Sequence, residues 1–160
     1  MPNWIEGSLK LRGSSENLKR FFTEMIQPST SYGEEAAKKE DFISCDFPDN
    51  NDDSNSVEIR HDAWIKGTRR AFVNDDCWVV FDNDDRKHTV CLPIRQAWAF
   101  DAESWCGISA ECGIDIRLYG IECGMQFCQE IEIIDGELVS NREIKYDDWE
   151  WECPLPFMGG

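Results

Sequence analysis

Acidic side chains offer the most chemistry in this sequence, because they gather in three segments that have the composition of loops or chain ends. The segments lie at residues 46–53, 75–85 and 147–152, and the last also carries tryptophans. Surface carboxylates attract basic partners, and an exposed aromatic ring can anchor such a contact. The alternative is that the tryptophans pack onto a sheet and the carboxylates are simply solvated. The candidate partner-binding residues are Asp46, Asp49, Asp52, Asp53, Asp75, Asp76, Asp82, Asp84, Asp85, Asp147, Asp148, Glu150, Trp151 and Glu152.

Metal ligation and catalysis find less support in the residue pattern. The eight cysteines include no Cys-x-x-Cys pair, and only His61 and His88 could join them as zinc ligands. Residues 49–54 have the composition of a calcium loop but lack the glycine and the closing glutamate of an EF-hand. No glycine-rich phosphate loop precedes a helix. The sequence therefore predicts no metal, no cofactor and no enzymatic activity, with a hydrolase of cryptic site as the alternative.

The net charge limits the possible partners. Thirty-two Asp and Glu residues stand against 16 Lys and Arg residues, which gives a net charge of −16. Such a chain is repelled by the phosphates of nucleic acids and of anionic membranes, so direct binding to either is not expected. A basic protein surface is the favoured partner, and solubility alone is the other explanation of the charge.

Compartment and domain organisation follow from what the chain lacks. No secretory signal is visible at the N-terminus, and no apolar run is long enough to span a membrane. We therefore expect a cytoplasmic protein whose cysteines are reduced and mostly buried. A chain of 160 residues is expected to form a single domain over residues 1–160, with a flexible acidic insertion at about residues 28–73.

The elements that position the acidic segments follow from the apolar periodicity. Alternation over residues 3–12 predicts a strand, and apolar residues three and four apart predict a helix at about residues 15–27. Residues 77–81, which predict a buried strand, and residues 89–100 flank an acidic turn and should form an antiparallel hairpin. Residues 48–56 are polar throughout and predict a mobile loop.

The C-terminal half carries clear start and stop signals. Asp101 is a suitable helix N-cap, and Gly113 is a suitable helix stop. Asp135-Gly136 predicts a tight turn between two strands. The elements predicted for this half are a helix at about residues 102–112 and strands at residues 114–119, 125–134 and 138–146.

The order of these elements is typical of the ferredoxin-like split βαβ fold. We therefore predict an α+β fold, in which an antiparallel sheet has its helices on one face. An acidic insertion follows the first helix, and a C-terminal β-hairpin extends the sheet. In such a fold the acidic segments lie in connections and at the chain end, where binding residues concentrate.

Three segments occur in an order that resembles a known family. They are Met1-Pro2-Asn3-Trp4, Ala97-Trp98-Ala99-Phe100 and Tyr119-Gly120-Ile121-Glu122-Cys123-Gly124-Met125-Gln126-Phe127. Together they resemble the YubB-type ferredoxin-like family, which phages, prophages and plasmids carry. The resemblance implies a ferredoxin-like fold and a mobile-element origin, but no activity. Ile5 stands where the family often has cysteine, which argues against a shared cysteine site.

These observations predict a phage or plasmid inhibitor that binds a host nucleic-acid-handling defence enzyme, such as a CRISPR effector or a restriction nuclease. Carboxylates spread over one face could imitate DNA and occupy the basic channel of such an enzyme. The alternative is a non-enzymatic protein-interaction module in a phage or plasmid replication or transfer assembly, where the charge serves only solubility.

Overall fold

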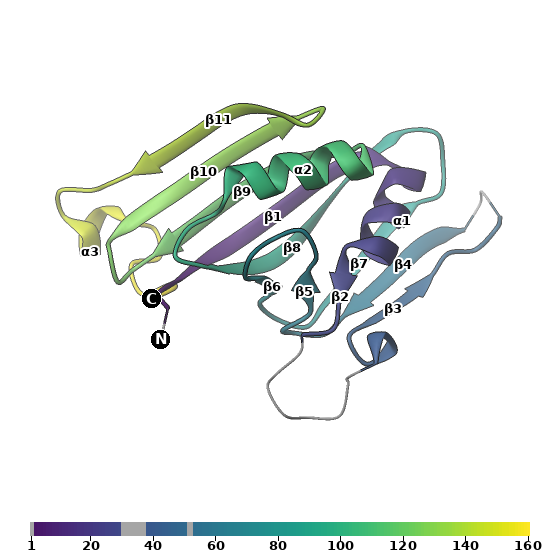
Figure 1. Cartoon of the computed structure of the whole chain (residues 1–160), viewed down its shortest axis with the longest axis horizontal. Helices are drawn as coiled ribbons and strands as arrows, with labels where there is room; N and C mark the ends of the chain where they lie inside the picture. The colour runs from purple at the N-terminus through teal and green to yellow at the C-terminus, as the bar shows by residue number, and fades with distance from the viewer. Residues whose placement is uncertain (1, 30–37, 51–52) are drawn as a thin grey trace.

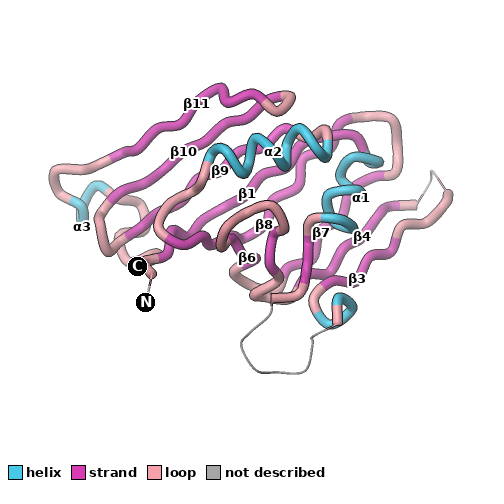
Figure 2. Tube along the Cα trace, in the orientation of Figure 1, coloured by secondary structure: helices cyan, strands magenta, loops and turns pink. Residues whose placement is uncertain are grey.

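The computed structural model describes residues 2–29, 38–50 and 53–160, and strands dominate it (Figures 1 and 2). A large antiparallel sheet has the order β11-β10-β9-β1-β8-β6-β5-β2, and a small one has the order β3-β4-β7. The large sheet consists of β1 (Trp4–Ser14), β2 (Ile26–Gln27), β5 (Trp64–Ile65), β6 (Ala71–Val73), β8 (Lys87–Ala97), β9 (Asp115–Glu122), β10 (Phe127–Ile134) and β11 (Glu137–Ile144). The small sheet consists of β3 (Ile43–Asp46), β4 (Ser54–Ile59) and β7 (Cys77–Asp82). The helices are α1 (Ser15–Glu24), α2 (Ala102–Cys112) and α3 (Trp149–Glu152), with a 3-10 turn, η1 (Lys39–Asp41).

The central strand β1 sets the two faces of the large sheet. It pairs with β8 along its whole length and with β9 on its other side. Successive residues of a strand point to opposite faces of a sheet. Ile5, Leu9 and Leu11 are buried on the face that the helices cover, whereas Lys10 and Arg12 are exposed on the other face.

The helices α1 and α2 lie against the same face of the large sheet (Figure 1). The Ser14 side chain caps α1 by accepting a hydrogen bond from a backbone N–H of its first turn. Asp101 caps α2, which ends at Gly113 with a φ of 67° that favours glycine. Trp105 of α2 lies in the core beneath, and its Nε1 donates to Oε1 of Gln96 at 2.9 Å.

The predicted ferredoxin-like α+β fold is wrong. Strands make up 46% of the described residues and helices 19%, and the main sheet has eight strands. The prediction fails because sequence reasoning treats most residues between α1 and β7 as an insertion of loops. These residues instead supply β2, β5 and β6, which extend the large sheet, and β3 and β4, which begin a second sheet.

The predicted hairpin between residues 77–81 and 89–100 is also wrong. β7 pairs with β4 in the small sheet, whereas β8 pairs with β1 and β6 in the large sheet. The acidic turn between them therefore carries the chain from one sheet to the other. Apolar runs indicate that two segments are extended, but they do not decide which strands pair.

Part of the segment predicted as a mobile loop at residues 48–56 is a strand. β4 begins at Ser54, and its residues Asn55, Val57 and Ile59 are buried on the inner side of the small sheet. The polar residues between them hide this alternation in the sequence. The candidate residue Asp52 lies outside the described residues.

The predictions for the C-terminal half are more successful. The helix at residues 102–112 is confirmed with both of its caps, and β10 and β11 form the expected hairpin. Its turn residues Asp135 and Gly136 have φ values of 50° and 79°, and positive φ at both positions is what a two-residue hairpin turn requires. Among the described residues, no helix is long and apolar enough to cross a membrane.

Candidate protein-binding surface

The small sheet presents a face to solvent that we call the outer face. Its inner side, which includes Val57, Ile59 and Phe81, packs into the core. The register places Trp78 opposite Glu58 and Val80 opposite Ser56 on the outer side. The outer face consists of Ser44 and Asp46 from β3, Ser54, Ser56 and Glu58 from β4, and Trp78, Val80 and Asp82 from β7.

An exposed tryptophan lies on this face. The side chain of Trp78 is 73% exposed, and Val80 beside it is 48% exposed. Exposed apolar groups within a polar rim are typical of protein-interaction sites, and tryptophan is enriched among residues that dominate binding energy. The sequence predicted that the apolar run at residues 77–81 is a buried strand. This prediction is wrong, because one side of the strand is exposed. Sequence reasoning missed Trp78, although the alternation of Val79 and Phe81 would have placed it on the opposite side.

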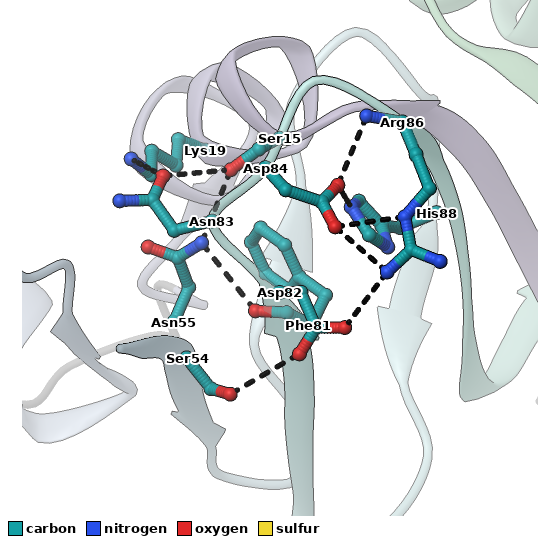
Figure 3. A network of polar contacts seen from close by, with 10 residues as sticks. All are labelled: Ser15, Lys19, Ser54, Asn55, Phe81, Asp82, Asn83, Asp84, Arg86 and His88. Carbon is teal, nitrogen blue, oxygen red and sulfur yellow. Dashed lines mark hydrogen bonds and ion pairs between the residues drawn. The ribbon is translucent and has the colours of Figure 1, made fainter. Parts of the chain in front are cut away.

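Two of the predicted acidic segments meet at one end of the outer face. The side chain of Asn83 donates from Nδ2 to the carbonyl of Pro48 at 3.1 Å, which ties the β7–β8 turn to the β3–β4 connection. The hydroxyl of Ser54 donates to Asp82 at 3.3 Å (Figure 3). The carboxylates of Asp46, Asp49, Asp53, Asp82 and Asp85 are all exposed at or near this end.

A polar network fixes the β7–β8 turn against α1 (Figure 3). The Oδ1 atom of Asn83 accepts hydrogen bonds from Lys19 Nζ at 2.9 Å and from the Ser15 hydroxyl at 3.2 Å. The buried side chain of Asn55 donates to the same hydroxyl at 3.1 Å. The turn is thus held by both α1 and β4, which positions its carboxylates before any partner binds.

Asp84 is paired within its own turn, and Arg86 also lies 3.4 Å from Asp82. The Asp84 carboxylate accepts from the Arg86 side chain at 2.8 Å and lies 2.8 Å from Nε2 of His88. The hydrogen bonds from the Arg86 side chain and backbone lower the pKa of Asp84 from 3.8 to about 2. Asp84 therefore stays ionised, but Arg86 offsets much of the charge that it could present to a partner.

The depressed pKa gives a pH-dependent contribution to stability. The ionised carboxylate favours the folded state, so its contribution is present above the unfolded pKa of 3.8 and is lost as the pH falls towards about 2. We expect Asp84→Asn to lose less free energy of unfolding than the wild type between about pH 5 and pH 2. Urea denaturation at a series of pH values measures this difference. Asp85→Asn is the matched control and should follow the wild type; parallel curves for the wild type and Asp84→Asn would contradict the prediction.

The segment at residues 75–76 lies at the other end of β7. Asp76 accepts a hydrogen bond from the His61 backbone N–H at 2.8 Å and lies 3.5 Å from Arg60. The bond from the His61 backbone is the main reason why the pKa of Asp76 is lowered. Asp75 is exposed and makes no ion pair with the residues that the structure describes. Carboxylates therefore flank the outer face at both ends of β7.

The third predicted segment is far from the other two. Figure 1 places α3 at the opposite end of the long axis from the small sheet. Trp149 is buried against Cys128 and Cys153, whereas Trp151 is 85% exposed. Asp148 caps the helix, and its backbone N–H donates to Glu152 at 3.1 Å. Asp147, Asp148, Glu150, Trp151 and Glu152 thus form a separate surface, which the structure does not bring together with the outer face.

The described residues offer little for nucleophilic or metal chemistry. No group of three or more His, Cys, Asp or Glu side chains in this part of the chain could hold a metal ion. Burial raises the pKa of Cys77 to about 11, and the nearby carboxylates of Asp76 and Asp75 add to the effect. Burial likewise raises the pKa of Cys112 to about 11. Thiols with such pKa values are not ionised at neutral pH and are poor nucleophiles.

Comparisons of the chain with known protein families, with curated proteins and with solved structures found no match. The resemblance to the YubB-type family stays a prediction.

Proposed function

We propose that the protein is an inhibitor from a mobile element that binds a basic surface of a host nucleic-acid-handling defence enzyme. The observation that carries the proposal is the outer face, where the exposed ring of Trp78 lies among carboxylates. None of the outer-face residues is basic. The protein acts in this proposal by occupying its target in the host cytoplasm and not by catalysis.

In this proposal the carboxylates set the association rate, and the apolar contact of Trp78 sets the dissociation rate. The carboxylates near Asp46 and Asp82, together with the net charge of −16, accelerate encounter with a basic channel. Duplex DNA carries a charge about every 1.7 Å of its axis, so the outer face alone is less charged than DNA. The carboxylates at both ends of β7 are therefore needed for mimicry, and burial of Trp78 would keep the complex together.

The choice of target depends on the predicted mobile-element origin. CRISPR effectors and restriction nucleases both handle nucleic acid through basic channels and are natural targets of a phage or plasmid protein. The second candidate function is an interaction module in a replication or transfer assembly. It is favoured by the exposed Trp151, Leu155 and Phe157 near α3, because a module that joins two components needs a second surface.

The test of the proposal is a pull-down against purified CRISPR effectors and restriction nucleases, followed by binding kinetics over a salt series. We expect the double variant Asp46→Asn with Asp85→Asn to associate roughly tenfold more slowly at low salt and to show a weaker salt dependence, because rim charges mainly set the association rate. Thermal stability should be unchanged or slightly higher, since like-charge repulsion falls.

The matched control removes the same charge at the other end of the molecule. Asp147→Asn with Glu150→Gln should associate much as the wild type does, because these side chains lie near α3. Equal slowing by both double variants would show that net charge acts without a defined surface. An affinity that does not change between low and high salt would end the mimicry proposal and leave the charge as an aid to solubility.

A further inference from the structure

A cavity of about 270 Å³ lies between the β5–β6 loop and the connection from β8 to α2. It is lined by basic, polar and aromatic groups, which are Arg69, Arg70, Gln96, Trp98, Phe100 and Asp101. Its volume is close to the lower end of the range for small-molecule sites, roughly 300–1,000 Å³. None of these residues belongs to the outer face or to the acidic segments, so a ligand bound in this cavity would not depend on the proposed function.

Trp98 has a backbone conformation that bulky side chains rarely adopt. Its φ is 73°, in the left-handed region, and its side chain is 58% exposed beside the cavity. The conformation is held by a hydrogen bond from its backbone N–H to the carbonyl of Asn3 at 2.8 Å, and the Ala97 N–H donates to the carbonyl of Arg70 at 3.1 Å. Such strain persists only where the surroundings enforce it, and it concentrates at ligand sites.

The two arginines of the cavity are free of carboxylate partners. Arg69 and Arg70 are exposed, and neither forms an ion pair within the part of the chain that the structure describes. The guanidinium of Arg70 lies 5.4 Å from the centre of the Trp4 ring. The register of β1 and β8 places Trp4 on the opposite face of the sheet from Gln96, so Arg69 is the arginine available to the cavity. Two adjacent unpaired arginines are unusual in a chain with a net charge of −16. Guanidinium groups match the geometry of phosphate oxygens.

Gln96 adds a buried donor. It is only 2% exposed, and its Oε1 accepts from Nε1 of Trp105 at 2.9 Å. Indole nitrogen is only a donor, so this contact fixes the amide orientation and leaves the Nε2 hydrogens for another acceptor. Nε2 has no hydrogen-bond partner among the described residues. Among the described residues, the only fully buried side-chain atoms without a partner are Asn55 Oδ1 and Arg95 Nε, so Nε2 of Gln96 is reached by solvent and is free to donate to a ligand.

We propose that this cavity binds a free nucleotide. Arg69 binds the phosphate, the exposed face of Trp98 stacks on the base, and the Nε2 atom of Gln96 donates to a base acceptor. Asp101 already caps α2 through Oδ1 and Oδ2, and its remaining lone pairs accept from ribose hydroxyls. A mononucleotide carries little charge, whereas a nucleic-acid strand is repelled by the whole acidic chain.

The experiment titrates the full-length protein with AMP, adenosine and inorganic phosphate by calorimetry. We expect AMP to bind at least about tenfold more tightly than either adenosine or phosphate, because only AMP uses both the Trp98 ring and Arg69. Trp98→Gly should weaken AMP binding by at least about tenfold, since stacking on the ring is lost. The same variant should keep or raise the melting temperature, because glycine adopts a positive φ without strain. Arg69→Ala should weaken AMP binding and leave adenosine binding unchanged.

Trp151→Ala is the control, because it removes another exposed tryptophan at α3 and should leave AMP affinity unchanged. The proposal is overturned if AMP, GMP, CMP and UMP all fail to bind at millimolar concentration. It is also overturned if Trp98→Gly and Arg69→Ala bind AMP as the wild type does. If a short DNA or RNA oligonucleotide binds more tightly than AMP, the cavity is a site for single-stranded nucleic acid. The proposal of a free nucleotide is then overturned.

Discussion

Replacing Trp78 by Ala is expected to accelerate dissociation of the inhibitor from its target by about 30-fold, which corresponds to roughly 2 kcal/mol. The reason is that a partner seated on the outer face would bury the ring, which is now 73% exposed. The association rate should change little, because it depends on the carboxylates. The free energy of unfolding should stay within about 0.5 kcal/mol of the wild type, because little of the ring is buried within the protein.

The dissociation rate is measured by following each variant as it leaves a surface that carries the immobilised target. Trp151→Ala is the matched control, since it removes an exposed tryptophan at the other end of the molecule. If Trp151→Ala dissociates faster and Trp78→Ala does not, the interface includes Trp151, one of the residues that the sequence suggested, and does not lie on the outer face. If neither variant differs from the wild type, a tryptophan anchor plays no part in binding.

Gly7→Ala is expected to destabilise the fold by about 3 kcal/mol or more. Gly7 lies on the central strand β1 opposite Gly120 of β9. A Cβ atom at residue 7 would lie 1.9 Å from the carbonyl oxygen of Tyr119 and 2.7 Å from the Cα atom of Gly120. Both contacts are backbone atoms, so no side-chain rotation can relieve them. The strands β1 and β9 would have to separate at the middle of the sheet.

Denaturation in urea measures this loss, and Gly107→Ala serves as the opposite control. A Cβ atom at residue 107 meets nothing within 4 Å, and the residue lies inside α2. Alanine should therefore stabilise the protein by about 0.5–1 kcal/mol through its higher helix propensity. A Gly7→Ala variant that unfolds at the wild-type urea concentration would show that β1 and β9 are not packed this closely.

Local elements with strong start and stop residues could be predicted from the sequence, because their signals act over a few neighbouring residues. Asp101 and Gly113 delimit α2, and Asp135-Gly136 fixes the β10–β11 hairpin. Strand pairing could not be predicted in the same way. β7 and β8 are both apolar and adjacent in the chain, yet β7 pairs with β4, whose alternation is hidden among serine, asparagine and glutamate residues.

The candidate surfaces could likewise be predicted in their local composition but not in their assembly. The sequence locates the carboxylates, because charged side chains in polar segments are mostly exposed. It does not predict that residues 46–53 and 82–85 meet, because the Asn83 contact that joins them depends on the pairing of β4 and β7. It also misses Trp78 and Trp98. The exposure of Trp78 follows only once the small sheet is known to have one side open to solvent. The position of Trp98 depends on its positive φ, which no residue pattern predicts.

The position of β1 has a consequence for the order of events during synthesis. β1 is made first, but its partners β8 and β9 begin at Lys87 and Asp115. At roughly 5–20 residues per second, β1 waits on the order of ten seconds for both neighbours. During that interval a strand with one apolar face and no partners is open to pairing with other nascent chains. The acidic residues that follow it would keep such chains apart, so charge could protect the protein before it has folded.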